Sequence, residues 1–263
     1  MQDGCEQVGR RVRIYLAGEI CIERRGSLMH EHQLPGPQGR HLFALLAAEH
    51  ARAVGHDEIA EELWGPEPPS AWRQSLKALA SRTRATLTTG GLADAVALVG
   101  APGLYGLRLP RDAWIDLEAA TASVHEAEAS LRHGDAAGAV TSAFVGRLIS
   151  ARPLLPGRAG RWVDGRRRAL AELRIRALEC AARARLALGE PEHAVHDLRL
   201  ALEIERMREP TWRLLMDAHA ANGDVASALL AYESCRGALR DTLGVGPSAA
   251  TRARHEALLA LTG

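Results

Sequence analysis

A chain of 263 residues has room for one large domain or for two domains of ordinary size. Hydrophobic residues make up 47% and charged residues 25% of it, which is typical of a folded protein and excludes wholesale disorder. The formal net charge of +1 neither predicts nor excludes a nucleic-acid partner. No apolar run approaches the ~18–20 residues that span a bilayer. The N-terminus also lacks the basic start and apolar stretch of a secretory signal, so we expect a cytoplasmic protein without a membrane partner.

The first hundred residues change from a strand pattern to a helix pattern. Short alternating runs between Val12 and Leu34 predict an antiparallel three-stranded sheet. The spacing of apolar residues then predicts a helix from Leu42 to His50 and a second one that Asp57 caps and Gly65 ends. Two strand-like runs around a turn at 100–103 predict a β-hairpin over residues 96–109.

Between the second helix and the hairpin, residues 70–87 predict a basic amphipathic helix. Ser70 follows Pro68 and Pro69 and is a good N-cap residue. At helical spacing, one stripe about 100° wide contains Trp72, Leu76, Leu79, Ala80, Thr83 and Leu87. The segment has four Lys or Arg residues and no Asp or Glu. Such a helix can pack one face on a domain and present the other to a DNA groove; an ordinary solvated basic helix is the alternative.

The residues outside the stripe suggest separate roles on DNA. Side chains on the outward face could reach base edges, and these are Gln74, Lys77 and Ser81. Arginines beside that face would lie where phosphates run, and they are Arg73, Arg82 and Arg84, with Arg108 as the contact from the hairpin. The acids of the preceding helix must face away from DNA, toward solvent, a second domain or a protein partner: Asp57, Glu58, Glu61 and Glu62.

Three segments of this half also match a known family pattern: Asp57 to Gly65, the Pro-Pro-Ser-Ala run at 68–71, and Leu76 to Arg84. They resemble the DNA-binding domain of the Streptomyces antibiotic regulatory proteins (SARPs), which is similar to the OmpR-type winged helix. In that family the recognition helix usually ends in Ser-Arg-Leu-Arg, and the wing usually carries Pro-Gly-Tyr. Here Thr83 replaces the leucine, so we expect a less firmly seated helix, and Leu104 lengthens the wing motif by one residue.

The second half has the pattern of a helical repeat. A Gly-Asp or Gly-Glu pair followed four residues later by alanine occurs at Gly134, Gly189 and Gly223. The last two copies are 34 residues apart, which is the tetratricopeptide period. We expect the glycine and acid to form the turn between paired helices and the alanine to allow close packing.

This half resembles the bacterial transcriptional activator domain of the same family. The matching residues are Trp162, Arg174 to Glu179, Arg208-Glu209, Leu215-Met216, Ala228-Leu229, Tyr232 and Leu239 to Ser248. The segment from Arg158 to Arg185 contains nine arginines but only three acids. That excess could meet DNA, an acidic face of RNA polymerase, or nothing. The simplest interpretation is a solvated helix face on which Glu172 pairs with Arg168 or Arg176.

Sequence motifs for catalysis are absent. The chain has no P-loop, GxGxxG, GxSxG or HExxH motif. The four cysteines are widely scattered and are interpreted as reduced thiols: Cys5, Cys21, Cys180 and Cys235. We therefore predict neither an enzyme nor a bound cofactor or metal.

Together these patterns predict a mainly α protein with a small β part. A winged helix-turn-helix domain over 10–110 would precede an all-α, tetratricopeptide-like domain over 111–263. The resemblance implies an activator that binds direct repeats in double-stranded promoter DNA near the −35 element as a homodimer and recruits RNA polymerase holoenzyme, usually for a biosynthetic gene cluster such as one for an antibiotic. The loop from Gly65 to Pro69 is a second candidate polymerase contact. Two alternatives stay open: a repressor or accessory regulator with the same domains, and a helical-repeat adaptor whose groove binds a peptide or small ligand.

Overall fold

The computed structural model describes residues 11–260, so Cys5 and the outer ends of both expected domains lie outside the described residues. The chain forms two compact units. The first runs to Ala119 and also takes in Arg152–Ala169, and the second consists of Ala120–Ala151 and the chain from Leu170 onward. The expected domains divide the chain at one point, whereas these units interleave along it.

A four-stranded sheet forms one side of the first unit. Strands β1 (Arg13–Tyr15), β2 (Cys21–Arg24) and β3 (Ser27–His30) pair antiparallel, as the alternation predicted. A fourth strand, β7 (Trp114–Ile115), pairs parallel with β1. Two residues are too short a run to show alternation, which is why the pattern did not predict this strand.

The helices of the first unit follow the sheet in chain order. A 3₁₀ turn, η1 (Glu31–Gln33), leads to α2 (Gly36–Ala48), α3 (His56–Trp64) and α4 (Trp72–Thr89). The core that they share with the sheet contains large side chains that are less than 2% exposed: Ile14, Leu16, Ile22, Leu42, Phe43, Leu45, Leu46, Ile59, Leu76, Leu79 and Leu87.

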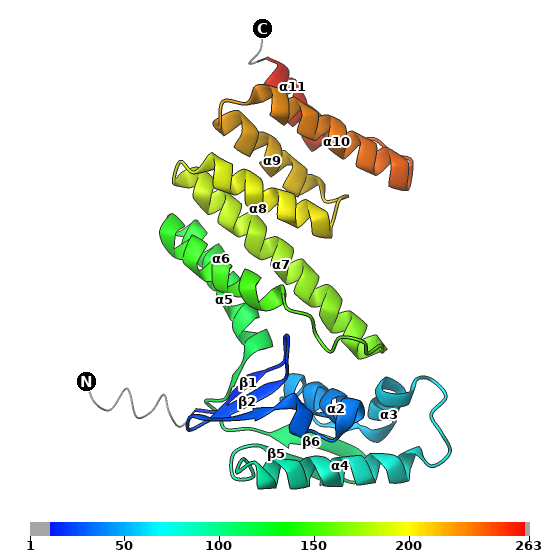
Figure 1. Cartoon of the computed structure of the whole chain (residues 1–263). Helices are drawn as coiled ribbons and strands as arrows, with labels where there is room; N and C mark the ends of the chain where they lie inside the picture. The colour runs from blue at the N-terminus through cyan, green and yellow to red at the C-terminus, as the bar shows by residue number, and fades with distance from the viewer. Residues whose placement is uncertain (1–10, 261–263) are drawn as a thin grey trace, which may run out of the picture. The chain divides into compact units, whose positions relative to one another are not determined.

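A three-stranded sheet completes the first unit. Its order is β4 (Val54–Gly55), β6 (Leu104–Arg108) and β5 (Ala97–Ala101). The hairpin of β5 and β6 lies alongside α4 (Figure 1). Its strands continue to Ala101 and resume at Leu104, so the turn is shorter than the expected one. Gly103 takes a φ of 75° there, a conformation that glycine adopts without steric cost.

Two predicted helix caps are wrong. The N-cap of α4 is Ala71 rather than Ser70, because the Trp72 amide donates to the carbonyl of Pro69 and a turn precedes the helix. The N-cap of α3 is Gly55, which places Asp57 inside the first helical turn. An acid there still interacts favourably with the helix dipole.

The second unit is helical throughout its described residues. Two helices are shared by the units, because α5 passes Ala119 and α7 passes Ala169. The helices are α5 (Asp116–Arg132), α6 (Ala136–Ser150), α7 (Arg161–Ala187), α8 (Pro191–Ile204), α9 (Glu209–Ala221), α10 (Val225–Leu243) and α11 (Ala249–Leu259). Helices α8, α9 and α10 stack as successive antiparallel neighbours (Figure 1).

The repeated glycine motif forms the predicted turns. Gly134, Gly189 and Gly223 have φ between 75° and 78° and lie between α5 and α6, α7 and α8, and α9 and α10. Asp135 and Asp224 cap the following helices by accepting a backbone N–H. The alanine four residues after each acid is 0% exposed, as expected for close helix packing; these are Ala139, Ala194 and Ala228.

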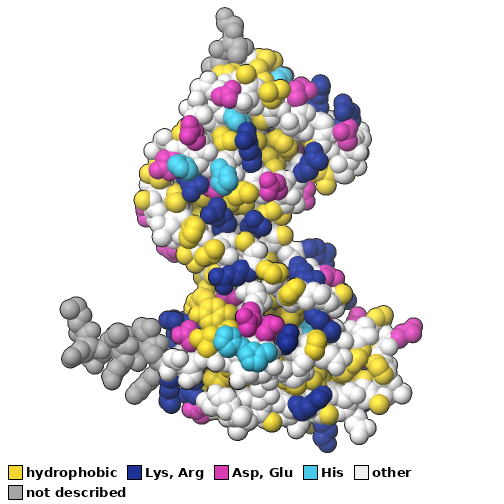
Figure 2. Space-filling view, viewed as in Figure 1, with side chains coloured by type: hydrophobic (Ala, Val, Ile, Leu, Met, Phe, Trp, Pro, Cys, Tyr) yellow, Lys and Arg dark blue, Asp and Glu magenta, His cyan; other side chains and the backbone are white. Residues whose placement is uncertain are grey.

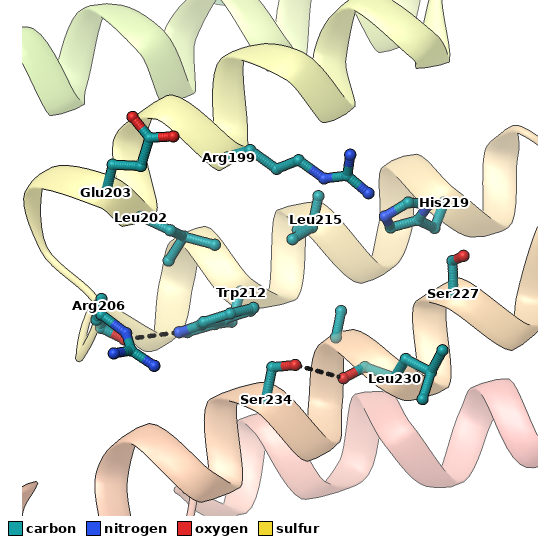
Figure 3. A pocket seen from close by; sticks show the side chains of 11 residues that line it. Arg199, Leu202, Glu203, Arg206, Trp212, Leu215, His219, Ser227, Leu230 and Ser234 are labelled. Atoms are coloured by element: carbon teal, nitrogen blue, oxygen red, sulfur yellow. Dashed lines mark hydrogen bonds between the residues drawn. The ribbon is translucent and has the colours of Figure 1, made fainter.

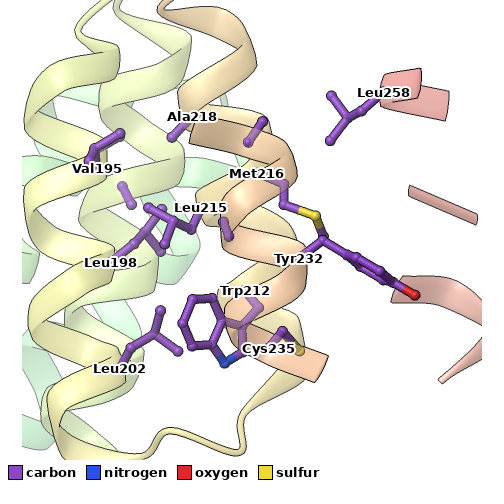
Figure 4. Packing of buried hydrophobic residues seen from close by; sticks show 14 of the residues in the cluster. Val195, Leu198, Leu202, Trp212, Leu215, Met216, Ala218, Tyr232, Cys235 and Leu258 are labelled. Atoms are coloured by element: carbon purple, nitrogen blue, oxygen red, sulfur yellow. The ribbon is translucent and has the colours of Figure 1, made fainter. Parts of the chain in front are cut away.

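The principal core of the second unit lies between α8, α9 and α10. Leu198 and Leu202 of α8 pack toward Trp212, Leu215 and Met216 of α9, with the side chains of α10 beyond them (Figure 4). The architecture confirms the predicted fold class, a mainly α chain in which a small β part belongs to a winged-helix unit. Within residues 11–260, no helix combines the length and apolar character needed to cross a bilayer.

Candidate nucleic-acid interface

The apolar stripe of α4 fixes the orientation of this helix. The six residues of the predicted stripe are all buried: Trp72, Leu76, Leu79, Ala80, Thr83 and Leu87. Thr83 is 0% exposed, and its hydroxyl donates to the carbonyl of Leu79 at 2.9 Å. Thr83 stands where the family usually has leucine, and its buried hydroxyl has a hydrogen-bond partner within the helix. The substitution therefore leaves no unpaired polar group in the core.

The opposite face of α4 presents a row of polar and basic side chains. Gln74, Lys77, Ser81 and Arg82 are all exposed. Among the described residues, neither Lys77 nor Arg82 forms an ion pair. Dark blue side chains appear along the edge where α4 runs (Figure 2). Because the helix contains no acid, the charges of Lys77 and Arg82 are available to an external anion.

Arg84 lies apart from that row. Its Nε donates to the carbonyl of Leu98 on β5 at 2.8 Å, and its guanidinium lies 5.6 Å from the centroid of the Tyr105 ring. Arg84 thus ties α4 to the hairpin. We expected it to contact phosphate, and the structure adds an internal role that orients the hairpin relative to the helix.

The two remaining predicted contacts lie at the edges of the surface. Arg73 stacks over the Trp72 ring at 4.3 Å and forms an ion pair with Asp57 at 3.3 Å, in which both side chains are well exposed. Arg108 is exposed at the end of β6, paired with Ala97. These seven residues, the predicted set, therefore lie on α4 and the hairpin of one unit.

Of the acids of α3, Glu62 turns inward as expected, whereas Asp57 pairs with Arg73 at the edge of that surface instead of facing away from it. Glu62 is 6% exposed, and its Oε1 accepts the backbone N–H of Trp162 at 2.5 Å, at the start of α7. Burial raises the pKa of Glu62. His41 lies 3.8 Å from the other carboxylate oxygen and is 0% exposed. Burial, with the charges of Arg158 and Arg167, lowers the pKa of His41 to about 4.

A second acid links the same segment to α2. Glu49 accepts the Trp162 indole N–H at 2.9 Å and also binds Arg166 and Arg52. Despite its desolvation, these hydrogen bonds lower the pKa of Glu49. Residues 152–169 are therefore an integral part of the first unit. The sequence signal was an acid, Glu62, at a position where the α3 stripe requires a buried residue.

The arginine-rich stretch is mostly paired, but not as predicted. Glu172 binds Arg208 at 3.0 Å rather than Arg168 or Arg176. Arg176 forms a two-point contact with Glu128 on α5, and Arg185 binds the fully buried Asp197 on α8. Basic and acidic side chains are interspersed over much of the surface in view (Figure 2). The described residues contain no group of three or more His, Cys, Asp or Glu side chains placed to hold a metal.

The fold and surface define a class: a winged-helix unit with a basic, acid-free outer helix, joined to a helical-repeat unit. Residues 115–259 match the family described as the bacterial transcriptional activator domain. The chain belongs to this family and to the SARP regulators of transcription.

Named relatives agree with this assignment. The transcriptional regulatory protein EmbR of Mycobacterium tuberculosis is 31% identical over 227 residues, which are 85% of this chain and 58% of EmbR. The regulatory protein AfsR of Streptomyces coelicolor is 31% identical over 211 residues, covering 80% of this chain and 21% of AfsR. The transcriptional regulator RedD of that organism is 31% identical over 223 residues, covering 84% of this chain and 63% of RedD.

A solved structure shares the fold. The structure of M. tuberculosis EmbR in complex with a low affinity phosphopeptide aligns with a TM-score of 0.80 and 27% identity, over 96% of this chain and 66% of that one. In the sequence comparison, this chain spans 58% of the length of EmbR, a little under three fifths.

Proposed function

We propose that this transcriptional regulator is a sequence-specific DNA-binding activator. The outward row of α4, Gln74, Lys77, Ser81 and Arg82, would enter the major groove, and Arg108 of the hairpin would contact the backbone. The observation that carries this proposal is that Lys77 and Arg82 are exposed and unpaired on a helix without acids. An unpaired cation has no internal role that would explain its position.

The same proposal assigns partners by family resemblance. Two copies would bind direct repeats near a promoter −35 element and recruit RNA polymerase, for a secondary-metabolite gene cluster. The helical-repeat unit would support dimerisation on the repeats and offer a surface to the polymerase. The loop from Gly65 to Pro69 is a second candidate contact, and the side chain of Glu67 is exposed within it. An exposed acid at a loop tip suits a basic partner surface.

Binding to DNA upstream of the neighbouring genes tests the first step. We expect a footprint over direct repeats and an affinity that falls steeply with salt. Replacing Lys77 and Arg82 together by alanine should weaken binding by roughly 30-fold or more and reduce the salt slope by about 1–2, if one residue reads a base and the other a phosphate.

The control variant removes the same charge elsewhere. Arg236 and Arg240 on α10 are exposed and pair with Glu233 and Asp241. Replacing both by alanine should leave the affinity for DNA within about twofold of the parent value. Unchanged binding in the Lys77 and Arg82 variant would show that α4 is not the reading helix.

Run-off transcription tests the activator assignment separately. Adding the protein to polymerase and the footprinted promoter should raise the yield of transcript, and Glu67→Lys should reduce that gain without changing DNA affinity. A lower yield from the same promoter would instead identify a repressor.

A further inference from the structure

A groove in the second unit is unrelated to the proposed DNA surface. It lies between α8, α9 and α10, and its volume is about 490 Å³, within the range of small-molecule sites. Leu202, Trp212 and Leu215 form its apolar floor, and Leu230 stands at its rim (Figure 3). Leu230 is 65% exposed, the largest exposure among the large hydrophobic residues of the described chain.

The aromatic surface in the groove is held in place. The Trp212 indole N–H donates to the carbonyl of Arg206 at 2.7 Å, which fixes the ring (Figure 3). Trp212 as a whole residue is 8% exposed and packs in the core cluster of this unit. A fixed aromatic ring on a concave apolar surface favours binding of a flat or apolar ligand, because little side-chain entropy is lost.

Arginines line both ends of the groove: Arg206 lies beside Trp212, and Arg199 lies at the end that also holds His219 (Figure 3). The side chain of Arg199 extends along the groove toward His219, whereas the carboxylate of Glu203 points away from Trp212 (Figure 3). Among residues 11–260, Arg199 forms no ion pair or side-chain hydrogen bond, unlike the nearby Arg185 and Arg208. An exposed and unpaired arginine above an apolar floor has the complementary charge for an acid with an apolar body.

His219 is the second polar group at that end. His219 is 7% exposed, and its ring forms no hydrogen bond with any other described residue. Burial first, and then the charge of Arg199, lowers the pKa of His219. The ring is therefore neutral at physiological pH and offers one N–H donor toward the groove.

We infer that this groove binds a small amphipathic carboxylic acid. Its carboxylate would be held by Arg199 and His219, and its apolar body would lie over Trp212, Leu215 and Leu230. This inference goes beyond DNA binding, and it would hold if the proposed promoter function were wrong, because the groove lies in a different unit from α4. A bound acid would link the three helices of the principal core.

Calorimetric titration of the full chain tests it with 4-phenylbutyrate as the probe and 4-phenylbutanamide as its uncharged match. We expect the acid to bind with a Kd on the order of 0.1–1 mM and the amide at least tenfold more weakly, since a charge-assisted hydrogen bond is lost. Absence of binding by the acid at 10 mM, well above the expected Kd, or equal binding of acid and amide, would overturn the inference.

Two variants at exposed positions locate the site without disturbing the core. Arg199→Gln should weaken binding of the acid about tenfold by removing its counter-charge, and Leu230→Glu should do the same by adding a like charge at the rim. Their matched controls are Arg236→Gln and Leu188→Glu, the latter at a residue that is 46% exposed. Equal losses in a variant and its control would contradict the assignment.

A titration with a peptide distinguishes a protein partner from a small ligand. A short acidic peptide with aromatic residues and a blocked C-terminus should bind more weakly than 4-phenylbutyrate, because ordering its flexible backbone costs conformational entropy that a compact acid does not lose. Tighter binding of this peptide, abolished by Arg199→Gln, would overturn the small-acid inference in favour of a docking groove for a protein segment.

Discussion

Helices α4 and α7 are both rich in basic residues, yet they use them in opposite ways. In α4, Lys77 and Arg82 extend from an acid-free face and remain unpaired. In α7, Arg166, Arg176 and Arg185 each bind an acid that lies outside this helix. The same residue type is thus a free charge in one helix and a packing element in the other.

This difference shows why arginine content alone does not identify a binding surface. Two of the acids that pair with α7 are distant in sequence: Glu49 lies 117 residues from Arg166 and Glu128 lies 48 residues from Arg176. Within α4 no acid is available, and among the partners that residues 11–260 provide, only Arg73 has an acid nearby, Asp57. A basic surface is therefore defined by which cations lack partners after folding.

The largest expected effect is on a buried α7 pair. Asp197 is 0% exposed and binds both Arg185 and Arg147. Arg185→Ala leaves that carboxylate with one partner and should lower the free energy of unfolding by about 3 kcal/mol in urea denaturation. The matched change in α4, Arg82→Ala, should alter it by less than about 0.5 kcal/mol. Similar losses in both variants would remove the distinction between the two helices.

Acidification should act on His41, whose pKa is perturbed first by burial and then by the charges of Arg158 and Arg167. The pKa of His41 is lowered to about 4 by burial and by Arg158 and Arg167, so the folded state resists protonation. The resulting stability is complete above the unfolded pKa of 6.5 and is lost as pH falls toward 4, by about 3 kcal/mol.

The variant His41→Leu isolates this effect from the other titrating groups. The difference in free energy of unfolding between the parent and the variant should shrink or change sign between pH 7 and pH 4, because only the parent has an imidazole that gains a proton on unfolding in that range. A difference independent of pH would show that Glu62, 3.8 Å away, compensates the charge.

Arg84 is intermediate between the unpaired cations of α4 and the ion-paired arginines of α7, because it forms an internal hydrogen bond but no ion pair among the described residues. Arg84→Lys keeps the charge but removes the Nε donor to Leu98 and the planar group over Tyr105. We expect a loss of about 1 kcal/mol in stability and faster amide exchange in β5 and β6. Weaker DNA binding with unchanged exchange would instead assign Arg84 to phosphate alone.

The smallest effect concerns the exposed pair of Arg73 and Asp57. Asp57→Asn should leave the free energy of unfolding within about 0.5 kcal/mol of the parent. Under the proposed function it should also raise DNA affinity about twofold at low salt, because a negative charge beside the helix is removed. A fall in affinity would show that Asp57 orients Arg73.

Local patterns predicted much of this structure. The α4 stripe and the three glycine turns follow from helical periodicity and from the φ angles that glycine tolerates, so neighbouring residues determine them. The cap of α4 was mispredicted because the turn formed by Pro69 and Trp72 displaces Ser70 from the capping position. Capping depends on backbone geometry that a preference for serine does not encode.

Long-range polar contacts were beyond that reasoning. Glu62 appeared only as an acid that must avoid DNA, and its partner Trp162 lies 100 residues away. The same holds for Asp116, which is 1% exposed and accepts the backbone N–H groups of Leu16 and Ala17 at 2.9 Å. Nothing in the local pattern around either acid specifies which distant group satisfies it.

The inclusion of Arg152–Ala169 in the first unit has a consequence for synthesis of the chain. On the ribosome, α2, α3 and α4 are made early, but the groups that satisfy Glu49 and Glu62 are made only after Ala120–Ala151. The unit built around the N-terminal half therefore cannot finish folding before part of the next unit has emerged. Its assembly is set by a late-arriving segment, and non-local closure of this kind is slow compared with the formation of the helices themselves.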